Sequence, residues 1–453
     1  MKRIAAVVGA LAALVATAPA QAATWTVDAA NPDVECPNAD STTIQGAVAL
    51  AAPDDTIHVC PGSYPETVVV DKPLSLEGAG PKPQLRSGDP TEEAVVEPGR
   101  TLGFVLGAPE IELEGFTIQG TSVGVTVNRF TSGHLIGKNL FAGNTTGLQV
   151  ASDGTLPSVV RANAFRANVR FAIFNNLTNG PFENARIEAN EFDSDESAIS
   201  LIGQVVDVSI DNNSFFGHRI SGVFVNGARI EITDNNFDSV TQSIRVSGFQ
   251  PNRVANNDIQ RGLHGIVFFA GLLAAVESNH VAQASGDGIS LQNYIRGEVR
   301  GNRVDASGRY GINLFNGTRE SAVKANRSDG NGVDGIRVDE TSSVNTIENN
   351  GFAGNGEHDC HDDSIGPGTG GTRNFWEHNH GDTASPPEIC KPTGQSEGEP
   401  ALLVSAATAF TAEPPCMPFT QARGTEIDSP AWDGAPWICD PTSDELEPAP
   451  EEP

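Results

Sequence analysis

The chain has few basic residues, few methionines and no long apolar segment, and each shortage excludes a class of protein. Its 28 Lys and Arg stand against 58 Asp and Glu, a net charge of −30. This balance argues against a nucleic-acid partner, because such binding needs a basic surface. Only two Met residues are present, which argues against a role in handling copper. No apolar run reaches the roughly 20 residues of a membrane-spanning helix.

The N-terminus has the pattern of a secretory signal. Lys2 and Arg3 precede an apolar run from Ile4 to Ala18, and Ala20-Gln-Ala22 supplies a small-x-small cleavage site. The apolar run is too short to span a bilayer. We therefore expect residues 1–22 to be a signal peptide and the mature protein, from about Ala23, to be extracellular.

The six Cys residues lack the short spacing of a zinc knuckle. In an exported chain they favour three disulfides instead. Proximity in sequence pairs Cys36 with Cys60, Cys360 with Cys390, and Cys416 with Cys439. All three predicted bridges lie outside the regular repeats described next.

One sequence motif recurs between residues 139 and 374. It consists of an Asn, any residue and then usually an apolar residue. About ten residues later a small residue and an apolar-x-apolar strand follow. The Asn anchors lie 22 to 27 residues apart and are Asn139, Asn163, Asn190, Asn213, Asn235, Asn257, Asn279, Asn302, Asn326, Asn350 and Asn374. A fixed period in the twenties indicates a solenoid. The fixed Leu positions of a leucine-rich repeat are missing, and the strands leave no room for a helix.

Short Val-, Ile- and Phe-rich strands separated by Asn, Gly and Asp describe one coil of a parallel β-helix. Coils stack about 4.8 Å apart, so equivalent residues form ladders. We expect each Asn amide to bond its neighbours above and below. The residues two places later should form an apolar stack inside, and they are Phe141, Phe165, Phe192, Phe215, Phe237, Ile259, Val281, Val304 and Phe352.

The fold predicted is all-β, a right-handed parallel β-helix solenoid with a short N-terminal capping helix. Residues 42–52 form that helix, and 23–110 the cap and first coils, with residues 81–100 as a loop that leaves the coil. Residues 111–390 form roughly eleven regular coils with a disulfide-closed end. There Trp376 is expected to plug the core. Residues 391–453 form a Pro-rich, acidic and mostly disordered tail.

On these residues the chain resembles the right-handed parallel β-helix repeat proteins, the architecture of pectate lyases and their relatives, over residues 42–390. That architecture carries lyases, hydrolases, epimerases, esterases and non-catalytic proteins, so the resemblance implies a fold and no single activity. Thr43-Ile-Gln45 with Gly62-Ser-Tyr64-Pro-Glu66 is similar to the first coils of pectin methylesterases. The later catalytic phrases of those esterases are missing, as are the motifs of pectate lyases and polygalacturonases.

The residue before the small residue of each coil forms a predicted column. In coil order the column is Ser221, Gln242, His264, Asp287, Tyr310 and Asp334, with Arg261 and Arg309 on the same turns. We expect Asp287 to bond the ring of His264, with Tyr310 next. His264, Asp287, Tyr310 and Arg309 would be the catalytic set of a lyase or epimerase: a base, a phenol, and a cation that neutralises a sugar carboxylate. Alternatively, these are ordinary turn residues that any stacked fold aligns.

Two other polar groups stand out. His358, His361, His378 and His380 could bind a transition metal, and Asp362 with Asp363 could hold Ca²⁺. We predict instead that these residues form polar surface on the last coil, which the predicted Cys360–Cys390 disulfide closes. We expect no cofactor, and the alternative is a bound Ca²⁺ ion. Arg245, Ser290, Asn313 and Arg337 face solvent from the recurring strand and form a polar strip that suits an extended glycan or plain solvated sheet.

The sequence predicts a monomeric carbohydrate-contacting surface or scaffold protein at the cell exterior, whose partner is a polysaccharide or cell-surface glycan. The alternative is a polysaccharide lyase or hydrolase that acts on an acidic glycan. Loops projecting around residues 219–337 would favour the enzyme, and a bare rod the scaffold. The acidic balance also fits adaptation to salt.

Overall fold

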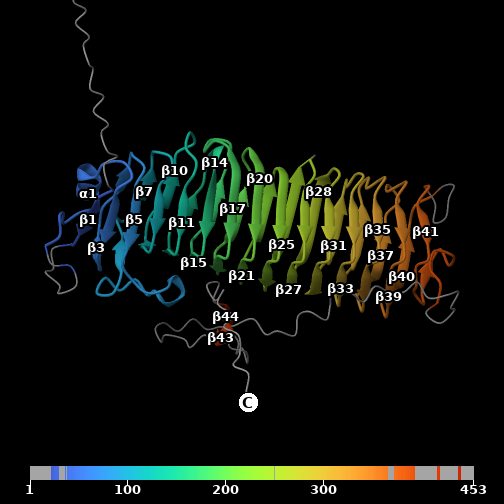
Figure 1. Ribbon diagram of the computed structural model, residues 1–453. Helices are drawn as coiled ribbons and strands as arrows, with labels where there is room; N and C mark the ends of the chain where they lie inside the picture. The colour runs from blue at the N-terminus through green and yellow to red at the C-terminus, as the bar shows by residue number, and fades with distance from the viewer. Residues whose placement is uncertain are drawn as a thin grey trace, which may run out of the picture.

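The computed structural model describes residues 22–29, 36, 38–248, 250–365 and 372–392, and the backbone of two short strands at 416–418 and 437–439. Three parallel sheets of 15, 14 and 13 strands wind around one core as a right-handed β-helix (Figure 1). Each coil contributes one strand to each sheet, and every strand pairs with its counterpart in the adjacent coil. The predicted fold class is confirmed.

The sheets are named here by their strand number. The 15-stranded sheet contains β1 (Thr24–Val27), β2 (Thr56–Val59), β5 (Ser75–Gly78), β8 (Glu112–Glu114), β11 (Leu135–Gly137), β14 (Ser152–Arg161), β17 (Phe182–Glu188), β20 (Val205–Asp211), β23 (Ala228–Thr233), β26 (Arg253–Ala255), β29 (Ala275–Glu277), β32 (Glu298–Arg300), β35 (Ala322–Lys324), β38 (Thr346–Glu348) and β41 (Phe375–Glu377). The 14-stranded sheet contains β4 (Val68–Val70), β7 (Leu102–Leu106), β10 (Val123–Val127), β13 (Thr146–Gln149), β16 (Phe171–Asn175), β19 (Ser197–Leu201), β22 (Ser221–Asn226), β25 (Gln242–Gly248), β28 (His264–Gly271), β31 (Ile289–Gln292), β34 (Ile312–Phe315), β37 (Asp334–Val338), β40 (His358–Asp362) and β42 (Ala384–Ser385). The 13-stranded sheet contains β3 (Gly62–Tyr64), β6 (Ala94–Val96), β9 (Thr117–Gln119), β12 (Leu140–Ala142), β15 (Ala164–Arg166), β18 (Glu191–Asp193), β21 (Ser214–Phe216), β24 (Asn236–Asp238), β27 (Asp258–Gly262), β30 (His280–Ala284), β33 (Arg303–Asp305), β36 (Arg327–Asp329) and β39 (Gly351–Ala353).

The predicted capping helix is α1 (Ile44–Leu50), which covers the first coil. The side chain of Thr43 caps it by accepting a hydrogen bond from the backbone N–H of Gly46. The loop predicted at residues 81–100 is only partly correct. It holds the short 3-10 helix η1 (Pro83–Leu85), but it also contains β6, which pairs with β3 and β9 and so belongs to the coil. The strand Ala-Val-Val is short and lies among charged residues, which hides its pattern.

The Asn ladder runs as predicted from Asn139 to Asn350. In each step the backbone N–H and the side-chain Nδ2 both donate to Oδ1 of the next Asn, as in Asn235 to Asn257 at 3.1 and 3.0 Å. Nδ2 also donates to a backbone carbonyl of the preceding coil, here Ile210 at 2.9 Å. The last predicted anchor is wrong: Asn350 donates to Asn379, whereas Asn374 accepts from Asn345 in a separate ladder.

A further ladder on the neighbouring turn links Asn144, Asn168 and Asp195. Asn168 donates from its backbone N–H and its Nδ2 to Asp195 Oδ1 at 2.7 and 2.8 Å. Asp195 is buried, and its Oδ2 has no hydrogen-bond partner among the described residues. Burial raises the pKa of this carboxyl to about 8.

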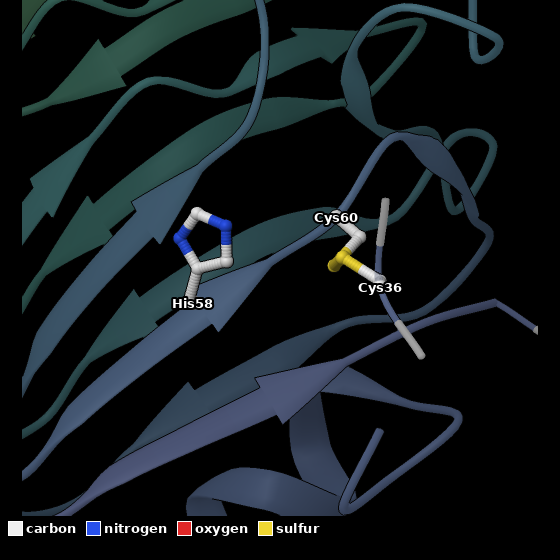
Figure 2. Close-up of side chains that lie close together, drawn as sticks. All are labelled: Cys36, His58 and Cys60. Carbon is white, nitrogen blue, oxygen red and sulfur yellow. A yellow bond between two sulfur atoms is a disulfide. The ribbon is translucent and has the colours of Figure 1, made fainter. Parts of the chain in front are cut away.

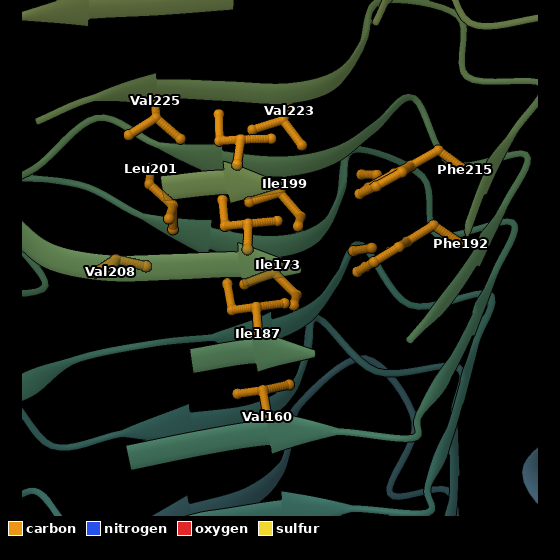
Figure 3. Packing of buried hydrophobic residues seen from close by; sticks show 14 of the residues in the cluster. Val160, Ile173, Ile187, Phe192, Ile199, Leu201, Val208, Phe215, Val223 and Val225 are labelled. Carbon is orange, nitrogen blue, oxygen red and sulfur yellow. The ribbon is translucent and has the colours of Figure 1, made fainter. Parts of the chain in front are cut away.

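The core consists of like residues stacked coil on coil. Phe141, Phe165, Phe192, Phe215 and Phe237 are buried, and adjacent rings lie nearly parallel with centroids 4.4 to 4.9 Å apart. Figure 3 shows Phe215 above Phe192 and the aliphatic column of Ile173, Ile199 and Val223 beside them. Each fully buried side chain of this size contributes about 2–3 kcal/mol, so the columns hold the coils in one register.

The ends are closed as the sequence predicts. Disulfides join Cys36 to Cys60 and Cys360 to Cys390. Trp376 is buried in the last coil and donates from Nε1 to Asp362. Strands β43 (Cys416–Pro418) and β44 (Trp437–Cys439) pair antiparallel with Cys416 opposite Cys439, but these side chains lie outside the described residues, so the third disulfide stays a prediction.

The predicted signal peptide and most of the predicted disordered tail also lie outside the described residues. Among the residues that are described, none of the helices is long and apolar enough to cross a lipid bilayer.

Candidate functional site

Two outward-facing columns meet at one corner of the 14-stranded sheet. The predicted polar strip forms one column, paired in register from Arg245 through Ser290 and Asn313 to Arg337, with Val267, which was not predicted, between Arg245 and Ser290. The prediction that the strip faces solvent is wrong for Ser290 and Asn313, which are buried because neighbouring side chains of the corner cover them. The predicted site column forms the other, and it precedes the strip by three residues in every coil: His264, Asp287, Tyr310 and Asp334. The sequence treated these columns as separate features, and the structure joins them.

Between the columns lies an open groove of about 390 Å³. All four predicted catalytic residues line it, together with members of the strip. The lining residues are His264, Val267, Asp287, Ser290, Arg309, Tyr310, Asn313, Phe315, Arg337, Asp339 and Glu340. No projecting loop forms its walls, because these residues belong to the coils and to the turn that follows β37. The volume falls within the range of small-molecule sites.

The small residue after each site-column member is required by packing. A Cβ added to Gly288 would lie 2.3 Å from Val304 Cγ1 and 2.8 Å from the carbonyl oxygen of Gly311. The chain therefore passes tightly over the core at this corner. That close approach places the preceding side chain at the groove, on a rigid backbone rather than on a loop.

Asp287 is the most buried acid of the groove, with a side chain only 6% exposed. Its Oδ2 accepts hydrogen bonds from Ser290 Oγ at 2.8 Å and from Asn313 Nδ2 at 3.1 Å. Its Oδ1 has no hydrogen-bond partner among the described residues, since Arg309 Nε stands 3.8 Å away, beyond hydrogen-bond distance. Oδ1 of Asn313 is likewise buried without a partner.

The predicted contact between the Asp287 carboxylate and the His264 ring is wrong in its atoms. The backbone N–H of Asp287 donates to His264 Nδ1 at 3.3 Å, while the carboxylate turns toward Ser290 and Asn313. In that arrangement Nδ1 is an acceptor and the ring proton of the neutral imidazole sits on Nε2. His264 is thus oriented by the backbone of the next coil.

Two cations lie against Tyr310. The guanidinium carbon of Arg309 is 4.9 Å from the ring centroid and that of Arg337 is 5.3 Å away, both within cation–π range. Arg337 is fixed by Asp363, to which its Nη2 donates at 2.6 Å, whereas the side chain of Arg309 is 56% exposed. Arg261 lies elsewhere, in an ion pair with Asp238.

Sequence reasoning missed Val267, Phe315, Asp339 and Glu340 as groove residues. Asp339 is held by the turn after β37, where its Oδ2 accepts from the backbone N–H of Asn316 at 2.8 Å. The signal available was the three-residue offset between column and strip. A constant offset indicates that the two columns lie at the same corner of every coil. The residues that follow the strands, such as Asp339 and Glu340 after β37, then line the end of the groove.

The polar groups near the C-terminal end separate in the structure. Asp334 is buried and contacts His358 and His361, and hydrogen bonding to Asp334 raises the pKa of the His361 imidazole. Asp362 faces Ser364 and Trp376, whereas Asp363 pairs with Arg337 and His361. The Ca²⁺ site stays a prediction, and these two carboxylates are each engaged by different protein groups.

A second cluster near the cap, Cys36, His58 and Cys60, cannot use its sulfurs as metal ligands. Figure 2 shows the disulfide that joins the two Cys residues. His58 lies on β2, and Cys60 directly follows the end of that strand. Because only a thiolate binds a metal, the oxidised pair offers no sulfur ligand.

Residues 221–374 match the family model described as the right-handed β-helix region, which covers the groove and about a third of the chain. No curated protein sequence matches the chain. Three solved structures similar to the protein are an α-1,3-glucanase from Streptomyces thermodiastaticus, a periplasmic alginate epimerase, and the tailspike of E. coli bacteriophage HK620 bound to a pentasaccharide.

The glucanase is 11% identical with a TM-score of 0.39, over 75% of this chain and 66% of its own. The epimerase is 14% identical with a TM-score of 0.41, over 72% and 84%. The tailspike is 13% identical with a TM-score of 0.36, over 71% and 68%. At these levels the likeness concerns the coiled architecture and not the residues of the groove.

Proposed function

We propose that the groove at the corner of β28, β31, β34 and β37 binds a segment of a carbohydrate chain. One observation carries this proposal: Oδ1 of Asp287 and Oδ1 of Asn313 are buried hydrogen-bond acceptors that lack a donor among the described residues, and both side chains line the same groove. A ligand that supplies two or more neighbouring donors would satisfy both.

Sugar hydroxyls suit these acceptors better than other common donors. A buried acceptor left without a donor costs about 1–3 kcal/mol, so a ligand that fills it gains that amount. A carboxylate fixed by Ser290 and Asn313 is also preorganised, because its orientation is set before the ligand arrives. Cationic ligands are a weaker fit, since Arg309 and Arg337 occupy the groove wall.

The remaining lining supports an extended, amphipathic ligand. Tyr310 and Phe315 supply apolar surface, and Arg309 supplies a half-exposed cation at the rim. Arg309 and Arg337 against Asp287, Asp339 and Glu340 give a mixed charge, which suits neutral or weakly acidic sugars. Arginine next to an aromatic ring accommodates both a sugar face and a sugar carboxylate.

The proposed setting is the cell exterior. The two disulfides at the ends of the solenoid are typical of oxidising compartments, and they agree with the signal expected at residues 1–22. We propose that the protein acts as a monomer, in which the solenoid is a rigid support that presents the groove.

Catalysis on an acidic glycan, as a lyase or hydrolase, is the second candidate. The observation that favours it is that His264, Asp287, Tyr310 and Arg309 all line one groove. A uronate lyase needs a base for the proton beside the carboxyl group and a cation that stabilises the resulting anion. Asp287 or His264 would be the base and Arg309 the cation.

The test is a panel of neutral glycans and polyuronates titrated against the protein by calorimetry. The same samples are followed for reducing ends and for the absorbance of unsaturated uronate. We expect binding that weakens about tenfold or more in Asp287→Ala, because truncation removes one good hydrogen bond, worth about 1–1.5 kcal/mol.

Gln149→Ala is the matched control, since Gln149 faces outward from β13 in the same sheet far from the groove, and it should leave binding unchanged. No binding by any glycan, or equal loss in both variants, would overturn the proposal. Product formation that disappears in His264→Ala or Tyr310→Phe would establish the catalytic candidate.

A further inference from the structure

The two columns of the groove continue for one more coil. Asp334 is paired in register with His358, and Arg337 with His361, so both imidazoles stand directly beyond the Tyr310 end of the groove. His358 and His361 lie on β40 on either side of Cys360, whose disulfide to Cys390 anchors this strand. The two rings are 4.6 Å apart, centroid to centroid.

The ligand atoms of this cluster lie close enough together to share one small metal ion. Asp334 Oδ2 is 2.8 Å from His361 Nδ1, and Asp334 Oδ1 is 3.3 Å from His358 Nδ1. One ligand atom from each residue lies within 4.8 Å of the others. Ligands about 2.0–2.2 Å from a tetrahedral zinc ion stand roughly 3.3 Å from one another. The His358 separation matches this value, whereas His361 Nδ1 and Asp334 Oδ2 stand at hydrogen-bond distance and would move apart by about half an ångström.

The charge of Asp334 requires a positive partner. Its side chain is 1% exposed, and its ion-pair partners among the described residues are these two histidines, with no Lys or Arg. The backbone N–H of His358 also donates to Oδ1 of Asp334 at 3.1 Å, but it carries no charge. A buried carboxylate without a cationic partner is costly. Either a proton on an imidazole or a metal ion would compensate it.

The second ring nitrogen of His361, Nε2, also has a carboxylate partner, and this distinguishes the cluster from a simple pair of one acid and one histidine. His361 Nε2 is 3.0 Å from Asp363 Oδ1, and Asp363 is itself held by Arg337. Histidines that ligate a metal commonly donate the other ring N–H to a carboxylate, which fixes the ring and its tautomer. With the proton on Nε2, Nδ1 presents a lone pair toward Asp334, and a metal ion bound to both atoms would stabilise that arrangement.

We propose that Asp334, His358 and His361 bind a divalent transition-metal ion, zinc by ligand type. Two imidazoles and one carboxylate suit zinc, whereas Ca²⁺ and Mg²⁺ prefer oxygen ligands alone. Three protein ligands leave a coordination position for water or a ligand oxygen, and the partly exposed imidazoles place that position at the surface beside the groove. The site does not depend on the glycan proposal.

The experiment uses the whole protein, stripped with a chelator and titrated with zinc chloride at pH 7.5 by calorimetry. Bound zinc is counted by elemental analysis after gel filtration. We expect a single zinc ion per chain, and loss of that ion in His358→Ala and in His361→Ala. Asp363→Asn should retain the ion with affinity weakened about 10- to 100-fold, the usual effect of removing a carboxylate behind a histidine ligand.

His378→Ala is the matched control, because His378 is an exposed histidine of the last coil outside the cluster, and it should bind zinc as the unchanged protein does. Far-ultraviolet circular dichroism verifies that each variant is folded, and His361→Gln replaces His361→Ala if the smaller side chain unfolds β40. A chain that binds no zinc would indicate that a proton alone compensates Asp334, and zinc that survives both histidine substitutions would be bound elsewhere. Either result would overturn the proposal.

Discussion

Asn313 donates from Nδ2 to Oδ2 of Asp287 at 3.1 Å across adjacent coils, and Oδ1 of each side chain has no donor among the described residues. The two residues thus form one unit, since each sets the direction in which the other presents its free acceptor. This arrangement is rigid because both side chains stand on paired strands or directly before them.

Glycan binding should therefore respond cooperatively to the two residues. Asn313→Ala removes one acceptor and also the donor that orients Asp287, so we expect a loss of affinity of about tenfold, or 1.4 kcal/mol. In Asp287→Ala with Asn313→Ala the loss should be smaller than the sum of the single losses, by about 0.5–1.4 kcal/mol. A calorimetric double-mutant cycle measures this difference, and strictly additive losses would contradict the shared unit.

The Asn ladder should carry much of the stability of the solenoid. Asn235 is buried and accepts two hydrogen bonds from Asn213 while donating to Asn257 and to two carbonyls. Asn235→Ala leaves these groups unpaired, and we expect a loss of about 3 kcal/mol or more. Urea denaturation followed by fluorescence measures it.

The adjacent Asn236 is an apt control, because it is exposed at the start of β24, directly after Asn235. Asn236→Ala should lie within about 0.5 kcal/mol of the unchanged protein. Similar losses in both variants would mean that the ladder is not the stabilising element.

The Phe column should be sensitive to a cavity. Phe215 lies between Phe192 and Phe237 with centroids 4.8 and 4.4 Å away. Phe215→Ala should destabilise the protein by about 3–5 kcal/mol, since stacked coils on both sides prevent collapse into the space. Phe269→Ala, at a position 44% exposed, should cost far less. Thermal unfolding of both variants tests the contrast.

Asp195 should make stability depend on pH. Burial raises its folded pKa to about 8 from an ordinary value of 3.8, so between those values the unfolded chain ionises while the folded chain keeps the proton. Rising pH then favours unfolding. The neighbouring His218 acts in the opposite sense only below about pH 6.5, because burial lowers its pKa to about 4.

Between pH 6.5 and 8 we therefore expect the unchanged protein to lose stability as pH rises, and Asp195→Asn to show a flatter profile. The amide keeps the acceptor for Asn168. The amide also places an N–H donor in the position of Oδ2. In the preceding coil, the equivalent Nδ2 of Asn168 donates to the backbone carbonyl of Phe141. Unfolding midpoints at several pH values measure the difference, and parallel profiles would contradict a protonated Asp195.

Much of the fold was predictable because every coil of a parallel β-helix carries the same short sequence motif. The Asn, the apolar residue two places later and the small residue before the strand recur in register, so one coil defines the next. The prediction failed where the period changed. Asn379 stands 29 residues after Asn350, and the longer last coil led the sequence pattern to select Asn374 instead.

The candidate site was predictable as columns but not as contacts. Spacing alone aligned His264, Asp287 and Tyr310, yet it could not show that Asp287 turns toward Ser290 and Asn313 rather than toward His264. Side-chain direction at a corner depends on the backbone of the adjacent coil. For the same reason, His358 and His361 were grouped with nearby histidines, whereas their partner Asp334 lies 24 residues upstream of His358.

The C-terminal closure has a consequence for self-association. Strands stacked in register along one axis share the geometry of a cross-β fibril, to which a further chain could add. Here the chain turns back over its last coil, where the backbones of His380 and Lys391 pair in a parallel β-bridge. Pro386 and Pro387 in this segment offer no N–H to an incoming strand. The Cys360–Cys390 disulfide ties this segment down. Reducing conditions would thus expose the strand edges of the last coil to a second chain, while the inner coils remain intact and α1 still covers the first coil.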